Sequence, residues 1–152
     1  GTGKTETMLS LLIAQQCQKL LVIVPTDPLR EQLSQKFISL GHLQKREFGI
    51  VASTAKKPIV GILYENFKTK EELLSFADKC NVIVTTMDLI SAGTLELQLA
   101  LSQCVSHVFI DEAHHIKAPT WLHFRNLCKK EKVIQFTATP FRNDGQNLAQ
   151  YH

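Results

Sequence analysis

The sequence has 152 residues, of which 44% are hydrophobic and 20% are charged, and its formal net charge is +3. This composition is typical of one folded domain or part of one, and it excludes a disordered chain, a collagen-like chain and a flexible linker. The small positive charge falls well short of that of a basic nucleic-acid-binding module. The longest apolar runs, Leu9–Ala14 and Leu20–Val24, are far shorter than the ~20 residues that cross a bilayer, so we expect no membrane span.

The chain begins at Gly1 without a Met, which suggests a fragment of a longer protein, and no targeting signal can be read from it. Its cysteines are widely spaced, and no two of them form a CxxC pair. This spacing favours reduced, buried thiols in an intracellular protein over a disulfide framework or a metal site. The four cysteines are Cys17, Cys80, Cys104 and Cys128.

Helical patterns alternate along the chain with short apolar runs that are rich in β-branched residues. In chain order we expect a helix over Lys4–Gln18, a strand over Leu20–Val24, a helix over 27–41, weaker strands over Phe48–Val51 and Ile59–Leu63, a helix from Thr69 to Cys80, a strand over Val82–Val84, a helix over Glu96–Ser102, a strand over Val105–Ile110, a helix over Ala118–Lys130 and a strand over Val133–Phe136.

Local signals support several of these helices. Asp27 is the predicted cap of the second helix, Pro28 takes its first position, and Gly41 ends it. Thr69 and Glu72 have the spacing of a capping box. The leucines from position 95 to 101 alternate as in a strand, but the good helix formers around them favour a helix.

Strands that alternate with helices predict an α/β fold in which helices cover both faces of a mostly parallel sheet. In such sheets, ligands bind beyond the carboxyl ends of the strands. Polar residues follow each of the four best strand candidates directly. These residues are Pro25-Thr26, Thr85-Thr86, Asp111-Glu112 and Thr137-Ala138-Thr139.

The first five residues, Gly1-Thr2-Gly3-Lys4-Thr5, match the end of the phosphate-binding loop pattern GxxxxGK[ST]. Glycines allow backbone N–H groups to turn toward phosphate oxygens, Lys4 would reach the outer phosphates, and the Thr5 hydroxyl would bind Mg²⁺. A match of five residues can also arise by chance.

Two adjacent carboxylates, Asp111 and Glu112, follow the apolar run Val108–Ile110. One of them can hold Mg²⁺ while the other polarises a water molecule. The pair could instead cap the next helix, where the helix dipole favours acidic residues. Capping explains the position of the pair but not its occurrence together with Lys4 and Thr5.

The segments GTGKT, VFIDEAH and FTATP, in this order, resemble motifs I, II and III of superfamily-two helicases and translocases. The stretch Val24–Gln32 resembles motif Ia, and Val84–Ile90 resembles a later motif that contacts nucleic acid. The tail Thr139–Gly145, together with the DEAHH segment, is most similar to the DEAD/DEAH-type branch that contains the type III restriction enzyme helicase subunits.

The resemblance implies that residues 1–152 are part of the first of two RecA-like P-loop NTPase lobes, truncated before the first strand and lacking the second lobe. The implied ligands are ATP and Mg²⁺, with residues 1 to 5 holding the nucleotide, Thr5 and Asp111 positioning Mg²⁺, and Glu112 activating the attacking water. Lys4 would act on the phosphates beside these two carboxylates. We expect the missing upstream strand to leave a seam in the middle of the sheet, and the isolated fragment to have little ATPase activity because the second lobe supplies the arginine finger.

The same resemblance implies that His114, Thr137 and Thr139 couple the nucleotide state to the nucleic acid. Several loop residues are expected to face the nucleic-acid backbone, namely Pro25, Thr26, Arg30, Thr85, Thr86 and Met87. Arg30 could equally be a solvated surface residue, and the two threonines after the last strand could be ordinary strand formers.

The function that we expect is that of an ATP-driven helicase or translocase lobe, with DNA favoured as the polymer. An RNA helicase is the neighbouring alternative. A nucleotide-binding module that switches partners without catalysis is an alternative from another class, although the intact Lys4, Thr5, Asp111 and Glu112 argue against it.

Overall fold

The computed structural model of the chain describes residues 7–8, 11–12, 18–39, 58–111, 118–129 and 132–136. The strands are β1 (Leu20–Val24), β2 (Val60–Ile62), β3 (Val82–Thr86), β4 (His107–Asp111) and β5 (Val133–Phe136). The helices are α2 (Asp27–Ser39), α3 (Lys70–Asp78), α4 (Met87–Ala92), α5 (Leu95–Cys104) and α6 (Ala118–Leu127). In this part of the chain, no helix has both the length and the apolar character that crossing a membrane requires.

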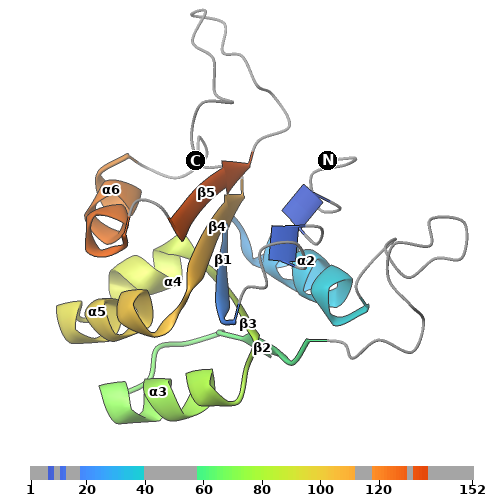
Figure 1. Cartoon of the computed structure of the whole chain (residues 1–152). Coiled ribbons are helices and arrows are strands. Elements are labelled where there is room, and N and C mark those ends of the chain that lie inside the picture. The colour runs from blue at the N-terminus through green and yellow to red at the C-terminus, as the bar shows by residue number, and fades with distance from the viewer. Residues whose placement is uncertain are drawn as a thin grey trace, which may run out of the picture.

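The five strands form one parallel sheet in the order β2-β3-β1-β4-β5 (Figure 1). β1 lies in the centre, paired with β3 on one side and with β4 on the other. The expected α/β architecture with a parallel sheet is therefore confirmed. The expected seam in the middle of the sheet is wrong, because each of these strands is hydrogen-bonded directly to its neighbour in the sheet.

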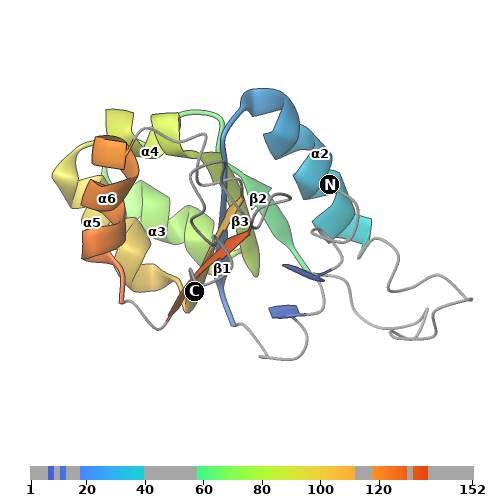
Figure 2. The same ribbon diagram turned by 90° about the horizontal axis from the view of Figure 1, so that it is seen from above.

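Two separate hydrophobic cores lie on the two faces of the sheet. Along β1, alternate side chains face opposite cores: Leu21 and Ile23 pack with α3, α4, α5 and α6, whereas Leu20, Val22 and Val24 pack with α2. Seen from above, α2 lies on one side of the sheet and α3 to α6 lie on the other (Figure 2). Helices on both faces explain why all five residues of β1 are buried.

Threonine residues cap the amino-terminal ends of four of the described helices. Thr69, Thr86 and Thr94 each accept a hydrogen bond from the backbone N–H three residues later, at the start of α3, α4 and α5. The expected cap of α3 is therefore confirmed. Asp27 as the cap of α2 is wrong, because the Thr26 carbonyl accepts from the Arg30 N–H and the Thr26 hydroxyl accepts from the Leu29 N–H, at 3.4 Å.

Most expected strands and helices occur with shifted ends. β3 extends two residues further than expected, to Thr86, and β4 begins at His107 because Val105 is the carboxyl-terminal cap of α5. The weaker strand at Ile59–Leu63 is present as β2, and the leucine-rich segment is helical, as expected. α6 ends at Leu127 rather than Lys130, and α4 was not expected at all.

The first expected helix is described only in part. The pairs 7–8 and 11–12 are helical, whereas Gln18 lies in a bend, so the helix ends before the expected residue. The expected strand Phe48–Val51 and the expected helix end at Gly41 lie outside the described residues.

Candidate functional site

Four strands end at the same level of the sheet, and this common edge is the candidate site. Val24, the last residue of β1, lies opposite Thr86, the last residue of β3. Ile23 lies opposite Ile110, which places Asp111 at the level of Val24, and Asp111 in turn lies opposite Phe136. Motif residues that are far apart in the sequence therefore follow strands that end together, as expected for a ligand site of a parallel sheet.

Asp111 is the one described member of the expected nucleotide and Mg²⁺ site. Its side chain is only 5% exposed, and it occupies the carboxyl end of β4, between β1 and β5. A carboxylate at this position fits Mg²⁺, because hard cations prefer oxygen ligands. No group of three or more His, Cys, Asp or Glu side chains that could hold a metal occurs among the described residues.

The other expected members of this site stay predictions. They lie outside the described residues, although Glu112 and Thr137 each follow in sequence the last residue of a strand that reaches the edge. These residues are Gly1, Thr2, Gly3, Lys4, Thr5, Glu112, His114, Thr137 and Thr139.

Pro25 and Thr26 form the connection from β1 to α2. Pro25 is half-buried and Thr26 is exposed, and both follow the end of β1 directly. The Thr26 hydroxyl accepts the cap hydrogen bond from Leu29, so its own proton remains available for an acceptor outside the helix.

Arg30 is buried, so the expectation of a solvated surface residue is wrong, and its expected contact with the nucleic-acid backbone stays a prediction. It is 7% exposed, and its Nη1 donates to the Leu63 carbonyl at 3.2 Å. Nη1 also lies 3.4 Å from the Asp27 carboxylate, and the guanidinium carbon lies 4.6 Å from the centre of the Tyr64 ring. Its physical role in this structure is to join α2 to the segment that follows β2.

The expected loop at Thr85, Thr86 and Met87 is wrong. Thr85 and Thr86 complete β3, Met87 begins α4, and all three are buried. The Thr85 hydroxyl donates to the Leu63 carbonyl at 3.5 Å, and the Thr86 hydroxyl accepts from the Leu89 N–H at 3.2 Å. Their side chains thus form internal contacts at the candidate edge, and their expected contact with nucleic acid stays a prediction.

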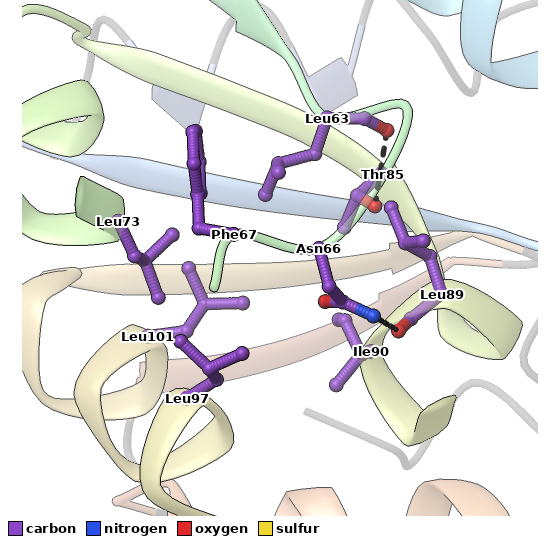
Figure 3. A pocket seen from close by; sticks show the side chains of 9 residues that line it. All are labelled: Leu63, Asn66, Phe67, Leu73, Thr85, Leu89, Ile90, Leu97 and Leu101. Atoms are coloured by element: carbon purple, nitrogen blue, oxygen red, sulfur yellow. Dashed lines mark hydrogen bonds between the residues drawn. The ribbon is translucent and has the colours of Figure 1, made fainter. Parts of the chain in front are cut away.

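The segment Leu63–Asn66 joins the elements at one end of this edge, and sequence reasoning missed it. The Leu63 carbonyl accepts from both Arg30 and Thr85, and the Asn66 amide donates to the Leu89 carbonyl in α4 at 2.9 Å. Figure 3 shows the last two of these contacts beside a small, mostly apolar cavity of about 20 Å³, which has room for a single water molecule. The polar residues that follow the expected strand Ile59–Leu63 were the sequence signal that could have indicated this segment.

Tyr64 lies on the outer side of this segment. Its hydroxyl donates to Glu31 Oε2 at 3.0 Å, and this hydrogen bond is the main cause of a pKa above the ordinary value for tyrosine. The phenol is therefore neutral at physiological pH. The residue is 56% exposed, although one face of its ring lies against Arg30.

The three described cysteines are free thiols, as expected. Cys80 and Cys128 are buried, whereas Cys104 is half-buried. Burial raises the pKa of all three thiols, and it raises the pKa of Cys128 to about 11. These thiols are thus protonated and poorly reactive at neutral pH.

Comparisons with known proteins identify similar chains. The family model described as type III restriction enzyme, res subunit, matches residues 1–142. A curated relative from Danio rerio, named "Putative helicase mov-10-B.1", is 27% identical over 130 residues, which cover 78% of this chain and 13% of the relative. The chain thus spans a small part of that relative.

Two solved structures share the fold. The UvsW helicase from bacteriophage T4 matches with a TM-score of 0.56 and 14% identity, over 96% of this chain and 45% of that one. The Hef helicase domain from Pyrococcus furiosus matches with a TM-score of 0.56 and 23% identity, over 93% of this chain and 29% of that one. Both comparisons support the expected RecA-like fold.

Proposed function

Because the chain belongs to the family of the type III restriction enzyme res subunit and has the RecA-like fold of a superfamily-two helicase lobe, we propose that it is the ATP-hydrolysing lobe of a DNA helicase or translocase. The observation that supports this most is the register of the sheet. It brings the ends of β1, β3, β4 and β5 to one level, and segments that resemble motifs Ia, II and III include three of these ends.

We infer that residues 1 to 5 hold ATP and that Thr5 and Asp111 hold Mg²⁺. When bound, Mg²⁺ neutralises charge on the transferred phosphoryl group. Glu112 would orient and deprotonate the attacking water, and Lys4 would stabilise negative charge on the outer phosphates. The burial of Asp111 supports this assignment, since a carboxylate shielded from solvent interacts more strongly with a cation than an exposed one does.

The nucleic-acid strand would cross the same edge of the sheet. Pro25 and Thr26 are the strongest candidates for contact with its backbone, because Thr26 is exposed and its hydroxyl can donate to a phosphate. His114, Thr137 and Thr139 would exchange hydrogen bonds as the nucleotide site opens and closes. A second lobe of the full-length protein would complete the site, and an intracellular location fits the need for ATP.

DNA is the favoured polymer because the description of the matching family names a restriction enzyme, a class of enzymes that acts on DNA. The RNA alternative remains a distinct outcome of the same assay. Single-stranded DNA and RNA of equal length and matched sequence would be compared as activators of ATP hydrolysis by the full-length protein. Stimulation by RNA alone would replace the DNA assignment with the RNA one.

The decisive test is Glu112→Gln in the full-length protein. We expect nucleic-acid-stimulated ATP hydrolysis to fall by about 10²-fold or more, with ATP still bound, because the amide cannot accept the proton of the water. Glu71→Gln is a matched control, since Glu71 is an exposed carboxylate in α3, outside the motif segments and the candidate site. Unchanged turnover in Glu112→Gln would overturn the motor assignment, and nucleotide binding without any stimulated hydrolysis in the unmodified protein would favour a non-catalytic switch.

A further inference from the structure

Tyr64 is an exposed aromatic residue at the end of the sheet where the candidate site lies. Ile62, the last residue of β2, pairs with Val84, which precedes the end of β3 by two residues. The Leu63 N–H continues this pairing by donating to the Val84 carbonyl. The chain therefore leaves β2 at the same end of the sheet as β3, and Tyr64, two residues after the end of β2, is 56% exposed.

The orientation of the Tyr64 ring is fixed from two sides. The Arg30 guanidinium lies against one face of the ring, and the hydroxyl is hydrogen-bonded to Glu31. Arg30 is itself held by the Leu63 carbonyl and by Asp27. A ring that is already fixed loses little rotational entropy when it binds a flat ligand.

We propose that the exposed part of the Tyr64 ring is a stacking site for an unpaired base of the bound nucleic acid. This proposal rests on the proposed function, and it adds a base contact to the contacts expected with the nucleic-acid backbone. Every base has an aromatic face, so stacking on tyrosine is largely independent of sequence. The Arg30 guanidinium lies over one face of the ring and interacts favourably with its π-electrons, which holds the ring in place.

The surrounding charges favour a base over a phosphate at this position. The Glu31 carboxylate accepts from the Tyr64 hydroxyl at the edge of the ring, and the Glu31 side chain is 49% exposed, whereas Arg30 is buried. This accessible negative group repels a phosphate placed at the ring. A strand whose backbone passes near Thr26 would therefore present a base, rather than a phosphate, to Tyr64.

The test uses the full-length protein and a single-stranded oligonucleotide, together with a series of oligonucleotides in which one abasic site moves along the strand. We expect an abasic site at one position to weaken binding to the unmodified protein by about 10-fold. Tyr64→Leu should weaken binding of the intact oligonucleotide to a similar extent and should lose the sensitivity to that abasic position. Tyr64→Phe keeps the ring but loses the hydrogen bond to Glu31, so it should retain most of the affinity and the sensitivity to that abasic position.

Leu95→Ala, at another exposed apolar side chain, serves as the matched control, and thermal unfolding verifies that each variant is folded. Equal affinity of Tyr64→Leu and the unmodified protein would overturn the stacking site, as would an undiminished abasic effect in Tyr64→Leu. Either result leaves the proposed function standing. An unmodified protein that binds no nucleic acid would instead refute the proposed function itself.

Discussion

The guanidinium carbon of Arg30 lies 4.6 Å from the centre of the Tyr64 ring, so one buried cation joins α2 to the segment after β2. The same side chain donates to the Leu63 carbonyl, which also accepts from Thr85 of β3. Three elements at one end of the sheet therefore meet at a single backbone oxygen. Their relative positions depend on side chains from distant parts of the sequence.

Arg30→Ala should destabilise the folded chain by about 1–3 kcal/mol, because it removes a hydrogen bond to a buried carbonyl and the contact with Tyr64. Arg30→Lys should recover only part of the loss, since an ammonium group lacks the planar guanidinium that lies on the ring. Urea unfolding measures the loss of stability in both variants. Gln32→Ala, at an exposed position of the same helix, should change stability by less than about 0.5 kcal/mol. Equal effects at positions 30 and 32 would contradict the structural role of Arg30.

Gly61→Ala should destabilise the chain by about 1–3 kcal/mol through crowding in the core. A Cβ at Gly61 would lie 2.4 Å from Cys80 Sγ and 2.6 Å from Phe76 Cζ, closer than real contacts allow, so both side chains would have to shift. Gly93→Ala is the control, because its nearest neighbour would be the Asn66 Oδ1 atom at 3.1 Å. Thermal unfolding should show a clear loss for the first variant and a smaller one for the second.

Lys19→Met should lower stability by about 1 kcal/mol. The Lys19 ammonium donates to the carbonyls of Ala77 and Cys80, where α3 ends and the helix dipole is negative. Methionine retains most of the apolar stem but cannot donate. Lys68→Met removes a charge from an exposed position before α3 and should have little effect on urea unfolding. Similar losses in the two variants would show that net charge, rather than the contact at the helix end, is responsible.

Cys128 should make stability fall as the pH rises above 9. Burial raises the pKa of its thiol from 9.0 to about 11 in the folded chain, so between these values the unfolded chain loses the proton first. The contribution is fully present below pH 9 and is lost as the pH approaches 11. The free energy of unfolding of the unmodified chain should therefore fall more between pH 7 and pH 10 than that of Cys128→Ala. Parallel pH profiles would contradict this assignment.

The strands were predictable because each is a short, mostly apolar run, and β1 and β3 are buried along their whole length, a pattern with few alternatives. β1 and β5 have the expected bounds, Leu20–Val24 and Val133–Phe136. The start of α2 was not predictable, since Thr26 and Asp27 are both good caps and only the backbone geometry distinguishes them. α4 spans six residues, which is too short for a helical period to emerge.

The candidate site was predictable in its location but not in its side-chain contacts. Residues that follow strands are expected at the carboxyl edge of a parallel sheet, and Asp111 lies there. The burial of Arg30 depends instead on Tyr64 and on the Leu63 carbonyl, more than thirty residues away in the sequence. Local patterns of charge and hydrophobicity contain no information about such a contact.

The division of β1 between two cores determines how mutations should combine. Leu21 and Val22 are adjacent in sequence, yet their side chains belong to different cores on opposite faces of the sheet. Leu21 and Leu101 are far apart in sequence and belong to the same core. Cavity-forming mutations at positions 21 and 22 should therefore have nearly additive effects on the free energy of unfolding. Cavity-forming mutations at positions 21 and 101 should instead be coupled. Which mutations interact in this chain thus depends on the face of the sheet and not on distance along the sequence.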